Sequence, residues 1–401
     1  MSTSSAAQPC IDEAITPCWK GVFAIALGAF TLVVTEFLPI GLLPGIIKGL
    51  GVSEGTAGLT VTVAAALGFL AAPATVLLVG RLDRRVVLLG FSALVIVSGV
   101  MSSLATHFST LLIARMIIGI GVGGFWSVSI TAASRLVPAD KVNKASSLVF
   151  AGISIASVVS IPAASYIAAH YNWRIAFMAA SALAIVVFAV QVFALPRIDM
   201  QKGVTARDFL ALLKSKKVVA IYLAIIFIVS GQFCGYTFVS PYLEQLAGFD
   251  ANTISAVLLG YGVLAVVGNF VAGELAGRDL HKTVYANVVL FLGSLIAIAA
   301  FPHHFVIAIV SLLCWALSWG MAPVGTQLWL YNSTQHAPEA AQSMNTSVFQ
   351  LSITLGSLIG GVVVDHVNLH ASMWTGAAIF GLAVLTVLVV GRMDALDARR
   401  P

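Results

Sequence analysis

About a dozen apolar stretches, each close to 20 residues long, fill almost the whole of this 401-residue sequence. A helix needs about 20 apolar residues to cross the hydrocarbon core of a bilayer. Only 9% of the residues are charged, whereas soluble domains carry about 25%. Such a chain lacks the polar groups to cover a water-facing surface, so we expect an all-α membrane protein.

Polar residues between the apolar stretches divide the chain into twelve expected helices, and charge orients them. Cytoplasmic loops of membrane proteins carry an excess of Lys and Arg. With the N-terminus inside, 18 of the 21 basic residues fall on the inner side and only Lys48 and Arg174 on the outer side. We therefore expect a multi-pass protein with both termini cytoplasmic, and we attribute the net charge of +5 to topology rather than to nucleic-acid binding. The expected helices are 19–43, 57–79, 86–105, 109–132, 145–168, 173–195, 218–240, 252–276, 283–302, 305–330, 342–364 and 372–391.

The longest inner connection divides the chain into two sets of six helices. Its stretch from Arg207 to Leu213 is amphipathic and is expected to lie along the inner membrane surface. Two halves joined by a polar loop are typical of transporters built from repeats, with the substrate path between the halves. The expected domains are a cytoplasmic tail 1–18, a six-helix bundle 19–195, a cytoplasmic linker 196–217, a second six-helix bundle 218–391 and a cytoplasmic tail 392–401.

Two charged residues, Glu36 and Arg115, lie deep inside expected spans. At 1.5 Å per residue, their depths from the outer helix ends are roughly 12 and 9 Å, so the two side chains can meet. Desolvation favours the neutral form of a carboxyl group, and a nearby cation favours its charged form. Glu36 is therefore the candidate proton carrier, with Arg115 adjusting its proton affinity. The alternative is a static buried ion pair that holds the two helices together.

Three further motifs are candidates for a conformational gate. The loop after the second span contains Gly80, Asp83, Arg84 and Arg85, which can bridge helix ends on the cytoplasmic side or form an ordinary charged turn. The fourth span carries closely spaced small residues, including Gly119 and Gly123, which allow close helix packing. The fifth span contains Pro162 among small residues.

These motifs carry a resemblance to a known family. The stretch from Arg115 to Gly124 resembles the fourth-helix motif of the major facilitator superfamily, and residues 80–85 resemble a shortened form of its loop between helices 2 and 3. The surroundings of Pro162 resemble the fifth-helix motif of its proton-coupled exporters, although Ile161 and Ser165 stand where glycines are usual.

Further stretches are similar to the bacterial purine ribonucleoside efflux pumps of the twelve-helix drug:proton antiporter family. The resemblance covers almost the whole chain and implies the superfamily fold, with twelve transmembrane helices in two six-helix bundles. It also implies proton-driven antiport by alternating access in a bacterial inner membrane, with no cofactor besides the proton gradient. The stretches are Glu36-Phe37-Leu38-Pro39, Gly123-Gly124-Phe125-Trp126, Gly231-Gln232-Phe233, Leu246-Ala247-Gly248-Phe249, Pro323-Val324-Gly325 with Trp329, and Val348-Phe349-Gln350-Leu351 followed by Gly360-Gly361.

Polar and aromatic residues within the spans are the candidates for substrate binding. Flat aromatic rings can stack on a purine, and such stacking is worth roughly 1–3 kcal/mol per base in nucleic-acid sites. Amide side chains can pair with the hydrogen-bonding edge of the base. For each aromatic residue, simple packing or a membrane-interface position is the alternative. The candidates are Phe37, Trp126, Gln232, Tyr236, Asn269, Trp315, Trp319, Gln327, Asn345 and Gln350.

The leading expectation is a proton-coupled exporter of purine nucleosides or their analogues. Sugar or multidrug efflux by the same mechanism is one alternative, and a passive facilitator or channel is another. An enzyme is not expected, because the sequence has no nucleotide-binding loop, metal cluster or nucleophile constellation. The expected partners are a small-molecule substrate, protons and the lipid bilayer, with no nucleic acid and no metal, and the chain is expected to be a monomer.

Overall fold

The computed structural model of the chain describes residues 17–79, 82–198, 206–334 and 338–397. Within these ranges the regular structure is helical, without β-strands. Twelve of the described helices are long and apolar enough to cross a membrane. The expected number of spans is thereby confirmed.

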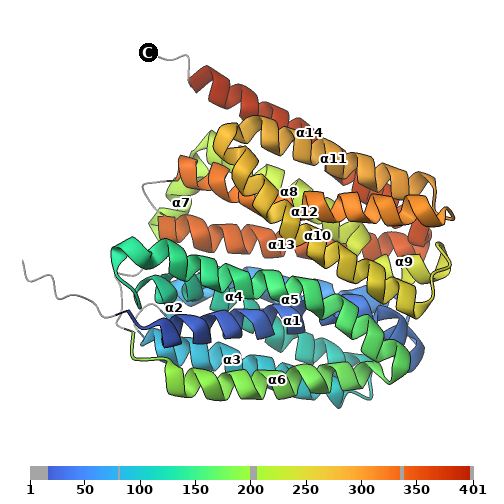
Figure 1. Cartoon of the computed structure of the whole chain (residues 1–401), viewed down its shortest axis with the longest axis horizontal. Helices are drawn as coiled ribbons and strands as arrows, with labels where there is room; N and C mark the ends of the chain where they lie inside the picture. The colour runs from blue at the N-terminus through green and yellow to red at the C-terminus, as the bar shows by residue number, and fades with distance from the viewer. Residues whose placement is uncertain (1–16, 80–81, 199–205, 335–337, 398–401) are drawn as a thin grey trace, which may run out of the picture.

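The first six spans form one bundle, which occupies the lower half of Figure 1. A single 3₁₀ turn, Ala139–Lys141, precedes the fifth span. The helices of this first bundle are α1 (Trp19–Leu50), α2 (Glu54–Leu78), α3 (Arg84–Ser103), α4 (Phe108–Ser134), α5 (Val142–His170) and α6 (Trp173–Ala194).

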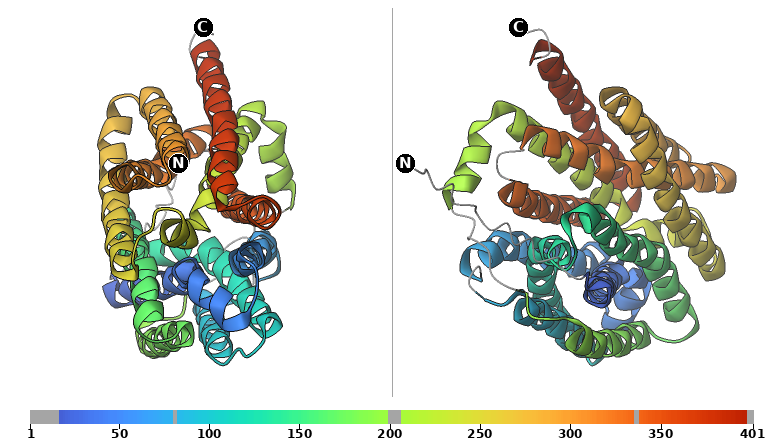
Figure 2. Two further views of the ribbon diagram at one scale, coloured as in Figure 1. Left: turned by 90° about the vertical axis from the view of Figure 1, so that its right-hand side faces the viewer. Right: turned by 60° about the vertical axis from the view of Figure 1, so that its left-hand side comes forward.

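The remaining spans form a second bundle, which occupies the upper half of Figure 1. The amphipathic stretch expected in the linker is a short helix, α7 (Ala206–Lys214), which precedes this bundle. Figure 2 shows the two bundles stacked on each other when the molecule is viewed along the helices. The helices of the second bundle are α8 (Lys216–Tyr236), α9 (Val239–Gln245), α10 (Ala251–Arg278), α11 (Leu280–Ala300), α12 (Phe305–Ser333), α13 (Pro338–His366) and α14 (Leu369–Asp397).

Helix ends follow local chemistry, and this explains where the expected boundaries were wrong. The first helix continues beyond residue 43 to Leu50 and ends at Gly51, whose φ of 63° is a left-handed conformation that glycine adopts without strain. The seventh span is divided into α8 and α9, because Pro241 has no N–H to donate to the carbonyl four residues earlier. Proline is tolerated in the first turn of α9, where no such bond is needed.

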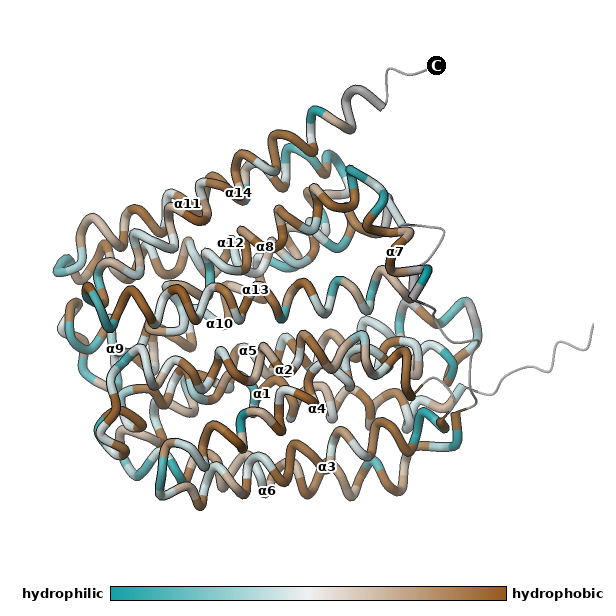
Figure 3. Tube along the Cα trace, turned by 180° about the vertical axis from the view of Figure 1, so that it is seen from behind, coloured by the Kyte–Doolittle hydropathy of each residue, from teal (hydrophilic) through white to brown (hydrophobic). Residues whose placement is uncertain are grey.

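The two ends of the molecule differ in what they carry. Helix α1 begins and α14 ends at the left in Figure 1, where α7 also lies; we call this end the terminal face. The opposite end carries α9 and the turn between α1 and α2; we call it the far face. Hydrophilic residues gather toward both ends in Figure 3, whereas the helices between them are mostly hydrophobic. Large apolar side chains such as Phe193 point outward, 89% exposed, as expected for a surface that contacts lipid.

Candidate functional site

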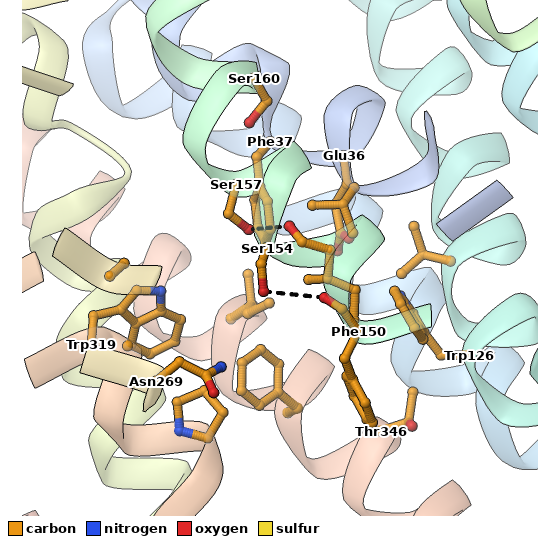
Figure 4. A pocket seen from close by; sticks show the side chains of 18 of the residues that line it. Glu36, Phe37, Trp126, Phe150, Ser154, Ser157, Ser160, Asn269, Trp319 and Thr346 are labelled. Carbon is orange, nitrogen blue, oxygen red and sulfur yellow. Dashed lines mark hydrogen bonds between the residues drawn. The ribbon is translucent and has the colours of Figure 1, made fainter. Parts of the chain in front are cut away.

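A cavity of about 310 Å³ lies between the two bundles. This volume is at the lower end of the range of about 300–1,000 Å³ that is typical of small-molecule sites. Helices α1, α4 and α5 of the first bundle and α8, α10, α12 and α13 of the second contribute its lining. The close-up in Figure 4 shows side chains from both bundles around this space.

Burial of the lining residues shows that the cavity opens toward the terminal face. Phe150, Asn269 and Gln327, which lie toward that face along their helices, are exposed. Tyr236 and Tyr261, which lie nearer the far face, are buried. The structure is therefore in a conformation that is open on the side of the termini and closed on the other side.

Direct contacts between the bundles close the cavity toward the far face. The hydroxyl groups of Thr62 in α2 and Ser357 in α13 lie 2.8 Å apart, and Ser240 donates a hydrogen bond to the Ile40 carbonyl at 2.9 Å. The backbones also meet closely: a Cβ at Gly55 would lie only 2.2 Å from the carbonyl oxygen of Gly361. Small and short polar residues thus allow α2 and α13 to pack against each other.

A carboxylate adds a polar link at the far face. Asp365, near the end of α13, accepts hydrogen bonds from the Ser53 hydroxyl at 2.7 Å and the Gly55 N–H at 2.8 Å. Both donors belong to the N-terminal end of α2, where free N–H groups and the helix dipole favour a negative charge. Lys48 and Glu244 add an exposed ion pair at 2.8 Å.

Glu36 is the one charged side chain among the described residues that line the cavity. Its side chain is 8% exposed, and its Oε1 atom accepts a hydrogen bond from Nε2 of Gln350 at 3.1 Å. Because Glu36 belongs to α1 and Gln350 to α13, this bond links the two bundles in the middle of the molecule. Both residues were predicted as site residues, but their direct contact was not.

Arg115 is fully buried and binds backbone carbonyl groups rather than the Glu36 carboxyl group. Its Nε donates to Thr60 O at 3.0 Å, and its two terminal nitrogens donate to Thr35 O and Glu36 O at 2.9 and 2.7 Å. The guanidinium group therefore joins α4 to α1 and α2. Among the described residues no ion pair joins Glu36 to Arg115, so the static ion pair considered above is absent from this conformation.

Eight of the ten predicted substrate-binding residues line the cavity, and two do not. Gln232 and Trp315 are fully buried behind the wall, where the Trp315 indole N–H donates to the Gln232 side chain. Gln232 in turn donates to the Tyr261 hydroxyl at 3.1 Å, so both residues support a lining residue. The eight lining residues are Phe37, Trp126, Tyr236, Asn269, Trp319, Gln327, Asn345 and Gln350.

Aromatic rings form much of the second bundle's wall. Tyr236 and Tyr261 are stacked with ring centroids 4.7 Å apart. Phe233 packs edge-on against Trp319 at 5.8 Å and is stacked with Phe37 of the first bundle at 5.9 Å. Ring pairs in this range of distances are favourable arrangements. The wall presents flat surfaces on which a planar ligand can stack.

Several lining residues were not predicted. Tyr261 was missed because a lone tyrosine in an apolar stretch has no distinguishing pattern. Ser154, Ser157 and Ser160 of α5 also line the cavity. Their spacing of three residues was a usable signal, because residues three apart lie on the same face of a helix.

The predicted gate residues of α4 and α5 pack inside the first bundle. A Cβ at Gly119 would lie 2.1 Å from the Ala64 carbonyl oxygen, and one at Gly123 would lie 2.2 Å from that of Gly68. The two glycines thus set the close contact of α4 with α2. Pro162 lies inside α5. The carbonyl group of the residue before it, Ile161, faces Gly41 of α1.

The charged loop between α2 and α3 also contacts the first bundle. The Asp83 carboxylate caps α3 by accepting a hydrogen bond from the N–H of Arg85 at 2.8 Å. It also accepts a hydrogen bond from the N–H of Ile198 at 3.1 Å. Arg85 donates to the Val192 carbonyl at the end of α6 at 2.7 Å. Arg84 is mostly buried, and Gly80 lies outside the described residues. A gating role for these residues stays a prediction.

Twelve spans in two bundles with a cavity between them are typical of membrane transporters. Residues 25–360 match the family model of the Major Facilitator Superfamily. The chain belongs to this superfamily and is a transporter rather than an enzyme, which confirms the resemblance drawn from its motifs.

Named relatives support this assignment over nearly the full length of the chain. The purine ribonucleoside efflux pumps NepI of Salmonella paratyphi B and Salmonella typhimurium are each 32% identical to it over 379 residues, which cover 94% of this chain and 95% of each pump. The crystal structure of the human organic anion transporter MFSD10 (TETRAN) superposes with a TM-score of 0.70 at 18% identity, covering 93% of this chain and all of that one. The latter similarity shows the shared fold.

Proposed function

We propose that this transporter exports purine nucleosides or close analogues in exchange for protons, by alternating access across a bacterial inner membrane. The observation that carries the proposal is Glu36, a buried carboxyl group in the cavity and the one charged side chain among the described lining residues. A carboxyl group placed between two bundles can bind a proton in one conformation and release it in another. The efflux pumps similar to this chain are named for purine ribonucleosides.

The bond between Glu36 and Gln350 supplies a physical link between protonation and movement. A hydrogen bond to a carboxylate is roughly twice as strong as one to a neutral acceptor. Deprotonated Glu36 therefore ties α1 to α13 more firmly than protonated Glu36 does. A substrate donor that binds the deprotonated Glu36 carboxylate competes with a proton for this group, and protonation of Glu36 weakens the tie to Gln350 and permits the bundles to rearrange.

The distribution of basic residues supports the direction of transport. With the terminal face in the cytoplasm, the cavity is open to the cytoplasm in this conformation. Substrate enters from that side and leaves at the far face, and Glu36 carries a proton in the opposite direction. The cavity volume of about 310 Å³ is at the lower end of the range of about 300–1,000 Å³ for small-molecule sites, which favours a compact ligand.

Transport by purified protein in liposomes tests the proposal. Wild-type protein is expected to concentrate inosine against its gradient when a proton gradient is imposed, and Glu36→Gln is expected to lose this accumulation. The neutral variant is expected to retain exchange of inosine for inosine and to show no pH dependence between pH 5 and 8. The Glu54→Gln variant, at a partly exposed glutamate on the far face outside the cavity lining, is the matched control.

Several results contradict the proposal in different ways. Inosine flux that is unchanged after collapse of the proton gradient indicates a passive facilitator. Accumulation of arabinose or a lipophilic cation in place of inosine indicates sugar or multidrug efflux. Full proton-driven transport by Glu36→Gln would show that Glu36 is not the residue that carries the proton.

A further inference from the structure

Ser154, Ser157 and Ser160 place three hydroxyl groups on one side of α5, along the wall of the cavity. Figure 4 shows them one above another, with Ser160 at the deep end beside Phe37. Successive members are separated by about 4.5 Å along the helix, given a rise of about 1.5 Å per residue. We refer to these three residues as the serine ladder.

The three hydroxyl groups differ in their bonding. Ser154 donates to the Phe150 carbonyl at 3.1 Å, and Ser157 donates to the Ile153 carbonyl at 2.9 Å. Each proton is thus engaged within α5, and each oxygen retains lone pairs that can accept a hydrogen bond. The ladder therefore presents acceptors that suit a ligand carrying hydroxyl donors.

Ser160 supplies the observation that points to a ligand. Its side chain is only 1% exposed, and its Oγ atom has no hydrogen-bond partner among the described residues, although it lines the cavity. A buried polar atom without a partner is unfavourable, so native structures provide one in nearly every case. A ligand hydroxyl in the cavity would satisfy Ser160 and continue the pattern of Ser154 and Ser157.

We propose that the serine ladder is a subsite for the hydroxyl-bearing, sugar part of the substrate. The aromatic rings of the second bundle then receive the planar base, so the substrate spans both bundles. This assignment rests on the proposed function and deepens it. Neither a free purine base nor a lipophilic drug offers several hydroxyl groups, so the ladder distinguishes nucleosides from both.

The test compares three ligands that differ in the sugar: inosine, its 2′,3′-dideoxy analogue and the free base hypoxanthine. Affinities are measured by titration calorimetry on wild-type protein and on the Ser157→Ala and Ser160→Ala variants in lipid nanodiscs. Each serine variant is expected to bind inosine about three- to tenfold more weakly, the typical loss for one hydrogen bond. Both serine variants are expected to bind hypoxanthine with the affinity of the wild type. They are also expected to bind the dideoxy analogue almost as tightly as the wild type does.

A second measurement separates ligand binding from a structural role. Because the Ser160 hydroxyl has no partner in the described protein, Ser160→Ala is expected to leave the thermal unfolding temperature unchanged or to raise it. The control is Ser181→Ala in α6, a buried serine that donates to its own helix at 2.7 Å and does not line the cavity. This control is expected to bind all three ligands like the wild type.

Two patterns would overturn the subsite while leaving the proposed function intact. One is equal weakening of inosine and hypoxanthine by the serine variants, and the other is wild-type affinity for inosine in both variants. A change in the pH dependence of binding without any change in preference for the sugar would assign the ladder to proton movement instead. A wild-type protein that binds neither inosine nor hypoxanthine would overturn the proposed function and the subsite together.

Discussion

Arg115 illustrates how a buried charge can be accommodated by backbone groups. Its guanidinium group donates to three carbonyl oxygens, two on α1 and one on α2. A guanidinium group presents several donors in a fixed planar arrangement, which an ammonium group cannot reproduce. The residue therefore acts in this conformation as a connector of three helices, and Glu36 keeps its carboxyl group free to interact with Gln350.

Replacement of Arg115 by lysine tests this role at the residue scale. The Arg115→Lys variant keeps the positive charge but cannot reach all three carbonyls, and each buried acceptor left without a partner costs about 1–3 kcal/mol. We expect thermal unfolding to occur at a clearly lower temperature than in the wild type. Glu36→Gln is expected to unfold near the wild-type temperature, because an amide can still pair with Gln350. Equal destabilisation by both substitutions would instead indicate an ion pair between Glu36 and Arg115.

The sequence was sufficient to select these two residues but not their partners. A lone carboxylate and a lone arginine inside apolar spans are conspicuous in a chain of this composition. The partners of Arg115 are backbone carbonyls, which every residue carries, so no sequence pattern marks them. That the Ser160 hydroxyl has no partner among the described residues is likewise a property of packing and not of residue type.

At the scale of elements, the far face is held by contacts between α2 and α13. The Asp365 carboxylate accepts hydrogen bonds from Ser53, which is the N-cap residue of α2, and from the N–H of Gly55 in the first turn of α2. This carboxylate is the component of the closure most easily removed without altering the packed surface, because it lies at the end of α13. It therefore offers a means to bias the conformational equilibrium.

The Asp365→Ala variant is expected to loosen the far face. A cysteine introduced at Thr62, in a background without the native cysteines, should react with a membrane-impermeant thiol reagent roughly fivefold faster or more, given a loss of about 1 kcal/mol per hydrogen bond. The matched control is Asp250→Ala. Asp250 caps its own helix α10 at the same face through Asn252 N–H. An equal rate increase in both variants would assign the effect to general loosening rather than to the link between bundles.

Element boundaries could be predicted where polar residues interrupt the apolar pattern. Asp83, Asn172 and Asp250 each cap the helix that follows them, as short polar side chains commonly do. The extension of α1 to Leu50 was missed because Pro44 and Gly45 suggest an end, whereas the helix continues to the left-handed Gly51. The pairing of α2 with α13 was also not predictable, since the residues that touch are about 300 positions apart, as in the contact of Thr62 with Ser357.

At the scale of the whole molecule, the two bundles enclose a cavity whose lining residues come from both bundles. Composition and hydropathy were enough to predict twelve spans and two halves, because the bilayer restricts a spanning chain to helices of known length. The conformation could not be predicted from the sequence, because opening at one face and closure at the other depend on contacts between the two bundles. We propose that Glu36 exchanges a proton for the substrate within this shared cavity.

Release of protons on substrate binding tests that claim most directly. Inosine is added to purified protein in weakly buffered detergent solution, at a pH low enough for Glu36 to bear its proton, and the pH is followed with an indicator dye. Competition between proton and substrate predicts release of up to one proton per protein by the wild type and none by Glu36→Gln, with both proteins still binding inosine. Proton release that persists in Glu36→Gln, or binding by the wild type without any release at any pH between 5 and 8, would contradict the account.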